Sequence, residues 1–322
     1  MPIGIAVWLL VTRVIPGDEV SFERGRLDVP GAGLVTTALM LAVYGIVGGN
    51  EAGWTSGRTL GILAASAVLM VVFVAWEARV EHPLVPLRLF RLRNVTISQI
   101  VGVLWAGAMF AWFFLSALFL QQVLGYGALE VGLAYLPTTI VMAFCSLQLS
   151  DRLVMRFGIR TPLTVGLGLA AVSLLLLARA PVDGSFVIDV LPSTLLLGLA
   201  AGIAFNPVLL AAMGDVEAQE AGLASGVVNT SFMMGGALGL AILVSLSTWR
   251  SDQLLSDGVA PLEAMNGGFQ LALAAGAVFA LAAAVVGGVF LRPHPMQTHE
   301  APEQATSDDE EDVPHELVDT TR

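Results

Sequence analysis

Uncharged amide side chains are the groups that could bind a substrate inside the long apolar stretches of this sequence. Gln121 and Gln122 stand at the end of one stretch, and Asn206 and Asn229 lie within two others. Each amide could hydrogen-bond a substrate or a neighbouring helix. Asn206 precedes Pro207, and because a proline frees a carbonyl and can bend a helix, such helices often line cavities. These four amides are candidate cavity residues, with contacts between helices as the alternative role.

Three aromatic side chains in one apolar stretch are spaced to share a helix face. Trp105, Trp112 and Phe119 are seven residues apart, which is close to two helical turns. Trp105 and Trp112 could therefore line an aromatic pocket for a small lipophilic molecule. The same stripe could instead pack between helices or face lipid.

The sequence lacks the residue groups that enzymes use inside a membrane. Its four histidines all lie in predicted loops or in the C-terminal tail, so no Ser–His pair can form at membrane depth. It contains no pair of acidic residues within the apolar stretches, no phosphate-binding loop and no cluster of metal ligands. Cys145 is the only cysteine, which excludes an intramolecular disulfide. We expect no enzyme activity, no metal, no cofactor and no nucleic-acid partner.

The composition indicates that these stretches lie in a lipid bilayer. Hydrophobic residues make up 56% of the chain and charged residues 13%, whereas soluble domains contain about 25% charged residues. Lipid offers the backbone no hydrogen-bond partners, so spans of about 20 apolar residues must be helices. The sequence predicts an all-α, polytopic membrane protein with eight transmembrane helices. The predicted spans are 29–48, 59–76, 96–121, 131–150, 162–178, 190–213, 222–248 and 268–291.

The distribution of arginine predicts the orientation of these helices, because cytoplasmic loops carry an excess of basic residues. All 15 basic residues are arginine. With the connector 13–28 inside, 12 of them face the cytoplasm and only Arg58, Arg179 and Arg250 lie outside. This bias predicts a cytoplasmic C-terminus for a multi-pass protein of the plasma membrane.

Small residues recur at a spacing of four in the predicted helices. Gly198 and Gly202 form one such pair, and Gly235 and Gly239 form another. Residues four apart share a helix face, and glycine there lets a second backbone approach closely. We expect these four positions to lie in contacts between helices.

Three stretches resemble one known family. These are HPLVPLRLFRLRN at 82–94, FLQQVLGYGALEVGLAYLP at 119–137 and EAGLASGVVNTSFMMGGALGLAIL at 220–243. They are similar to the connector, an outer loop with its following helix, and the penultimate helix of the fourteen-helix drug:proton antiporters of the major facilitator superfamily. The resemblance covers essentially residues 1–291 and matches the C-terminal part of that family, with its N-terminal bundle missing.

The turn at 151–160 resembles the cytoplasmic loop motif of this superfamily. Arg156, Gly158 and Arg160 match it, whereas Asp151 replaces its first glycine and Met155 replaces its aspartate. The resemblance implies that this loop, which also contains Arg152, holds two helical bundles together in one conformation. The alternative is that these are ordinary cytoplasmic arginines.

The resemblance also implies how the chain is divided. Residues 1–28 would be a partial helix with a cytoplasmic connector, and 29–76 a two-helix transmembrane linker. A basic cytoplasmic connector at 77–95 would lead into a six-helix transporter bundle at 96–291. Residues 292–322 would form a disordered acidic tail in the cytoplasm, because the tail contains few apolar residues.

The function implied by the resemblance is export of small lipophilic, drug-like molecules in exchange for protons. The family's proton-coupling acid would lie in the missing N-terminal bundle, and alternating access needs two halves around a central site. We therefore expect a truncated C-terminal portion that does not transport alone. One alternative is a non-transporting membrane subunit that pairs with another half-transporter, and a third hypothesis is an autonomous homodimeric carrier.

Overall fold

The computed structural model describes residues 28–80, 83–84, 87–214, 216 and 221–291, together with positions 4, 5, 7, 10 and 13. Helices account for nearly all of these residues, and no strand occurs in them. Most of the predicted segment 1–28, four positions of the predicted connector 77–95 and the predicted tail 292–322 lie outside the described residues.

Eight helical segments in the described part of the chain are long and apolar enough to cross a membrane. Each corresponds to one of the eight predicted spans, so the prediction of an all-α polytopic membrane protein is confirmed. Several spans are longer than predicted because their helices continue past the apolar stretch into the loops. The elements are α2 (Val29–Ala52), α3 (Gly57–Glu77), η1 (Leu87–Arg91), α4 (Arg93–Leu118), η2 (Phe119–Val123), α5 (Ala128–Ala134), α6 (Leu136–Phe144), η3 (Cys145–Ser150), α7 (Asp151–Phe157), α8 (Arg160–Leu177), η4 (Phe186–Val190), α9 (Leu191–Met213), α10 (Ala221–Ser256) and α11 (Pro261–Phe290).

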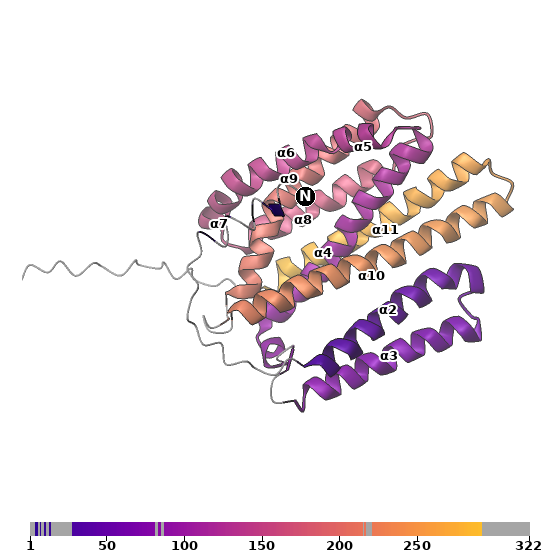
Figure 1. Cartoon of the computed structure of the whole chain (residues 1–322). Helices are drawn as coiled ribbons and strands as arrows, with labels where there is room; N and C mark the ends of the chain where they lie inside the picture. The colour runs from indigo at the N-terminus through magenta and orange to yellow at the C-terminus, as the bar shows by residue number, and fades with distance from the viewer. Residues whose placement is uncertain are drawn as a thin grey trace, which may run out of the picture.

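The helices lie side by side, from the α2–α3 hairpin at one side of the molecule to α6 at the other (Figure 1). The α2–α3 hairpin lies at one side and contacts α10 through α2. Helix α10 packs against α4 and α11, α8 lies between α11 and α9, and α6 packs on α9. The fully buried core therefore gathers on α4, α8, α9 and α11, with Trp112, Leu167, Leu197 and Leu273 as central side chains.

Buried serines and amides connect the helices of this core. The Oγ atoms of Ser173 on α8 and Ser193 on α9 lie 3.1 Å apart, and the indole N–H of Trp112 donates to Ser193 Oγ at 3.0 Å. On α11, the amides of Asn266 and Gln270 both donate to the carbonyl of Ala180, at 3.1 and 3.2 Å. These bonds satisfy polar groups that lipid would leave unpaired.

The α2–α3 hairpin is fastened at both ends. Near the start of α2, Asp28 caps the helix by accepting from the N–H of Gly31 at 2.9 Å, and it also accepts from the indole of Trp76 at 3.0 Å. At the opposite end, the amide of Asn50 donates to the carbonyl of Ser245 on α10 at 3.1 Å. The hairpin is thereby attached to the remaining helices through α10.

The four glycines singled out by their spacing lie where backbones come close. A Cβ atom at Gly198 would lie 2.5 Å from the carbonyl oxygen of Thr138 on α6, and one at Gly202 would lie 2.6 Å from Cβ of Cys145. Gly235 and Gly239 lie against α4, where added Cβ atoms would meet backbone atoms of residues 103 and 107. Glycine is therefore what permits the close approach of α9 to α6 and of α10 to α4.

Candidate substrate-binding cavity

A cavity of about 360 Å³ lies between α4, α9 and α10. It brings together Trp105 and Asn229, two of the candidate residues, from helices far apart in the sequence. Most of its other walls are apolar. The lining residues are Trp105 from α4, Phe205, Val208 and Leu209 from α9, and Ser225, Gly226, Val228, Asn229 and Phe232 from α10.

Phe232 is the centre of an aromatic cluster at this cavity. Its ring meets that of Phe205 on α9 edge to face, with centroids 6.0 Å apart, and that of Phe110 on α4 in the same way at 6.1 Å. Edge-to-face contacts of this kind stabilise by about 0.5–1.5 kcal/mol beyond the buried area. The cluster therefore connects three helices, and Phe205 and Phe232 form an aromatic wall of the cavity.

Trp105, Ser225 and Asn229 supply the polar side-chain groups at the cavity. The side chain of Trp105 is fully buried, and its indole N–H finds no hydrogen-bond partner in the described part of the chain. A buried donor without an acceptor destabilises by about 1–3 kcal/mol. Asn229 is exposed one turn before Phe232. The site thus combines apolar walls with three side chains that could hydrogen-bond a bound molecule.

Asn206 is directed toward a different helix. It is half-buried, and its amide nitrogen lies 3.4 Å from both the carbonyl oxygen and Oγ of Ser146 in η3. Helix α9 continues through Pro207, which is buried, to Met213. Of the two roles considered for Asn206, this geometry is that of a contact between helices, while its neighbour Phe205 lines the cavity.

The other candidate residues lie away from this cavity. Trp112 is fully buried in the core, where it donates to Ser193. Gln121 and Gln122 are exposed in the π-helical turn η2, which ends the third span. They are 16 and 17 residues beyond Trp105, which corresponds to about 24 Å along a helix. The six candidates therefore do not form one site.

A comparison with known families decides which family this helical arrangement represents. Residues 77–240, just over half of the chain, match the family described as Major Facilitator Superfamily. The chain belongs to the major facilitator superfamily. It is therefore a member of a family of membrane transporters and not of an enzyme family.

Several superfamily relatives carry names that refer to antibiotics. The chain is 34% identical over 251 residues to the cephamycin export protein CmcT of Amycolatopsis lactamdurans, covering 77% of this chain and 51% of that protein. It is 32% identical over 289 residues to the puromycin resistance protein pur8 of Streptomyces alboniger, covering 88% of this chain and 57% of that protein. A lincomycin resistance protein of Streptomyces lincolnensis is 34% identical over 250 residues, 76% of this chain and 50% of that protein. The chain spans about half the length of the relatives that it matches.

The turn that resembles the superfamily's loop motif joins α7 to α8. Gly158 ends α7 with φ of 73°, a left-handed conformation that glycine adopts without strain, and its N–H bonds the carbonyl of Val154 at 2.8 Å. Asp151, Arg152 and Arg156 are exposed on α7, as is Arg160 at the start of α8. The guanidinium of Arg156 lies 5.3 Å from the ring centroid of Phe157. The four charged side chains therefore lie on the surface of the described chain.

The aromatic wall of the cavity was not predicted from the sequence. Phe205 and Phe232 were not among the candidates, although Ser225, Asn229 and Phe232 recur at spacings of four and three along α10. This periodicity places them on one helix face. Starting from Asn229, the same spacing would have led to Phe232, whereas the contribution of α9 depends on how the helices pack.

Proposed function

We propose that this chain is the C-terminal portion of a fourteen-helix exporter that exchanges lipophilic, drug-like molecules for protons across the plasma membrane. The observation that carries the proposal is the cavity between α4, α9 and α10, with its aromatic wall and its three polar side chains. The relatives named for export of, or resistance to, antibiotics support the substrate class.

The cavity has the size and chemistry of part of a drug-binding site. Ligand pockets commonly measure about 300–1,000 Å³ and combine apolar walls with a few polar groups that fix the orientation of the ligand. At about 360 Å³ the cavity is at the lower limit of this range. A lipophilic ring could pack on Phe232 while an acceptor oxygen takes a hydrogen bond from Asn229 or, after a small side-chain shift, from Trp105.

In this proposal α2 and α3 are a linker pair, and the six spans built from α4 to α11 form one six-helix bundle. A second bundle closes the cavity from the open side and supplies the acidic residue that binds the proton, as alternating access requires. The turn between α7 and α8 faces the cytoplasm, as does the C-terminus. Its exposed arginines, Arg152 and Arg156, hold the second bundle by charge.

Binding of a dye to the purified chain tests the cavity. We expect ethidium, a lipophilic cation, to bind saturably in detergent and the variant Phe232→Ala to bind it about tenfold more weakly, because the aromatic wall is lost. The matched control is Phe144→Ala, which removes an exposed phenylalanine from α6, outside the cavity. Equal affinities of the two variants, measured by fluorescence anisotropy, would exclude the cavity as the binding site.

Transport by proteoliposomes tests the need for a second bundle. We expect residues 1–322 alone to show no efflux of ethidium under a pH gradient, because one six-helix bundle cannot open alternately to both sides. A relative that spans the full fourteen helices serves as the positive control. Gradient-dependent efflux by this chain alone would contradict the requirement for a partner bundle.

A second candidate function is a non-transporting membrane subunit that pairs with a separate half-transporter. The exposed arginines of the α7–α8 turn and the cavity between α4, α9 and α10 could equally meet a helical bundle supplied by a separate chain. The DNA upstream of the Met1 codon separates the two proposals. An open frame encoding further apolar spans, one of them with an acidic residue, favours the exporter, whereas an in-frame stop codon favours the subunit.

A further inference from the structure

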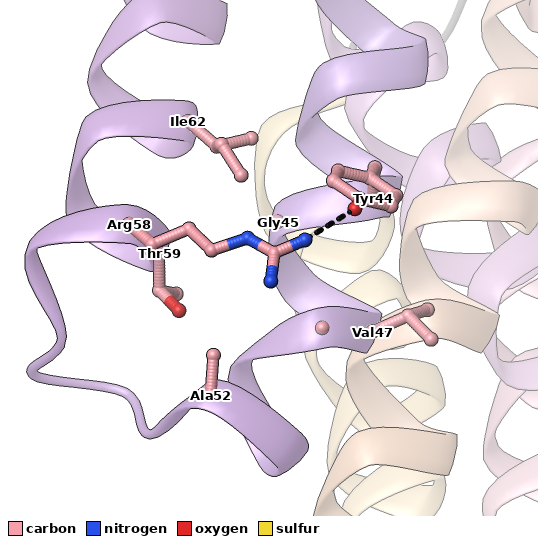
Figure 2. A pocket seen from close by; sticks show the side chains of 8 residues that line it. Tyr44, Gly45, Val47, Ala52, Arg58, Thr59 and Ile62 are labelled. Atoms are coloured by element: carbon pink, nitrogen blue, oxygen red, sulfur yellow. Dashed lines mark hydrogen bonds between the residues drawn. The ribbon is translucent and has the colours of Figure 1, made fainter.

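A cationic pocket lies between α2 and α3, close to the turn that joins them. It measures about 280 Å³ and contains Tyr44 from α2 and Arg58 from α3 (Figure 2). The guanidinium of Arg58 reaches across to α2 and donates to the hydroxyl of Tyr44 at 2.8 Å. Both side chains are exposed, and a guanidinium has five N–H donors, so donors remain for an anion.

This pocket continues into an apolar groove between α2 and α10. The groove has a volume of about 670 Å³ and shares Tyr44 and Val47 with the cationic pocket. Its α2 wall carries Val35 and Met40, and Met234 stands on its α10 wall. Met40 is 67% exposed and Tyr44 53% exposed, so the described chain leaves the groove uncovered.

The part of the groove between Tyr44 and Val35 is about as long as one leaflet of a bilayer is deep. Tyr44 and Val35 are nine residues apart on α2, which is about 13 Å at 1.5 Å per residue. The hydrocarbon core of a bilayer is about 30 Å thick, so one leaflet is about 15 Å deep. Arg58 lies close to the end of the hairpin, at the opposite end of the molecule from the α7–α8 turn (Figure 1).

We propose that this site binds one phospholipid from the leaflet on the Arg58 side, with its phosphate on Arg58 and Tyr44 and one acyl chain in the groove between α2 and α10. Guanidinium groups match the geometry of phosphate oxygens and bond them in pairs. The apolar groove adjoins the cationic pocket at Tyr44, the partner of Arg58, and that order of charge and hydrocarbon is the order within a phospholipid. The bound lipid fills the gap between the hairpin and α10 and so helps to fix the position of the hairpin.

Native mass spectrometry of the detergent-purified full chain tests this site, with phosphatidylglycerol as the titrated lipid. We expect one lipid to remain bound to the wild type and to Arg179→Gln, which removes an exposed arginine from the same end of the molecule. Arg58→Gln should weaken this binding at least about tenfold, as expected for loss of a charge-assisted contact. Met40→Trp, which fills the groove without changing any charge, should also release the lipid.

The two arms of the experiment separate a phospholipid from a free phosphate compound. Glycerol 3-phosphate, which carries the headgroup chemistry without acyl chains, should not compete for the site at concentrations at which phosphatidylglycerol saturates it. If Arg58→Gln and Met40→Trp both retain the lipid as Arg179→Gln does, the proposal is wrong. Competition by glycerol 3-phosphate together with unchanged binding by Met40→Trp would overturn the acyl-chain assignment. Circular dichroism of each variant checks that the helices are intact.

Discussion

Trp105 and Trp112 are the same residue type on the same face of α4, and both side chains are fully buried. Their indole nitrogens nevertheless have different surroundings. Trp112 donates to Ser193 at 3.0 Å, whereas Trp105 has no acceptor among the described residues. The first side chain connects α4 to α9 inside the core, and the second lies at the wall of a cavity. The two tryptophans therefore differ in whether the indole N–H has a hydrogen-bond acceptor.

Replacing each tryptophan by phenylalanine measures this difference. We expect Trp112→Phe to lower the free energy of unfolding by at least about 1–3 kcal/mol more than Trp105→Phe does, because Trp112 loses a hydrogen bond whereas Trp105 loses a buried donor that has no acceptor. Both substitutions remove similar ring volume at fully buried positions, so each controls for the packing loss of the other. The measurement is the unfolding transition in detergent on titration with sodium dodecyl sulfate. Equal losses would show that the bond to Ser193 contributes nothing.

At the scale of the helices, glycine spacing decides how closely α10 can approach α4. Gly239 lies against Gly107, so that two backbones meet without side chains between them. Gly226, on the same helix, lies beside the cavity, and a Cβ atom there would have no neighbour within 4 Å. Attraction between helices in lipid comes mainly from close packing. Gly239 therefore matters for this contact in a way that Gly226 does not.

The variants Gly239→Ala and Gly226→Ala test this distinction. We expect Gly239→Ala to destabilise by about 1–3 kcal/mol, because the added methyl group forces α4 and α10 apart. Gly226→Ala should leave the stability unchanged or raise it by up to about 1 kcal/mol, because alanine favours the helix. The unfolding assay used for the tryptophan variants provides the comparison. A Gly239→Ala protein as stable as the wild type would contradict a tight contact at this position.

At the scale of the whole molecule, arginine is concentrated at one end. Arg93, Arg156 and Arg160 lie at the end where α4 begins and α7 turns into α8, and Arg93 donates to the carbonyl of Phe290 at 3.2 Å. Arg58 lies at the start of α3 and Arg250 near the C-terminal end of α10. Both are at the opposite end of the molecule (Figure 1). Because basic loops stay in the cytoplasm, we expect the α7–α8 turn to be inside.

Labelling of single cysteines tests this orientation. Cys145 is buried and is replaced by alanine, after which Met155→Cys and Thr55→Cys introduce exposed thiols at opposite ends of the molecule. We expect a membrane-impermeant maleimide to label Thr55→Cys in intact spheroplasts and Met155→Cys only in inverted vesicles. Each variant serves as the control for the other. The reverse pattern would place the C-terminus outside.

The eight spans could be predicted because lipid imposes a strict requirement on composition, which stretches such as 96–121 satisfy. The ends of the helices were predicted less accurately, since the predicted span 222–248 corresponds to a helix, α10, that continues to Ser256. The cavity was harder to predict. Asn229 and Asn206 are both asparagines in apolar helices, yet one lies at the cavity and the other bonds Ser146. The local difference between them, Pro207 after Asn206, does not indicate which of the two lies at the cavity, because that depends on which helix lies opposite.

The sequence by itself predicted the eight segments of the described chain that are long and apolar enough to cross a membrane, and its motifs pointed to the major facilitator superfamily. These properties depend on the polarity of residues that are near in the chain, which the bilayer selects directly. Only the tertiary structure decided that Trp105, Phe205 and Phe232 share a cavity, that Trp112 bonds Ser193, and that Arg58 reaches Tyr44. Those relations join residues on different helices, and they depend on helix packing, which is set by many weak contacts at once.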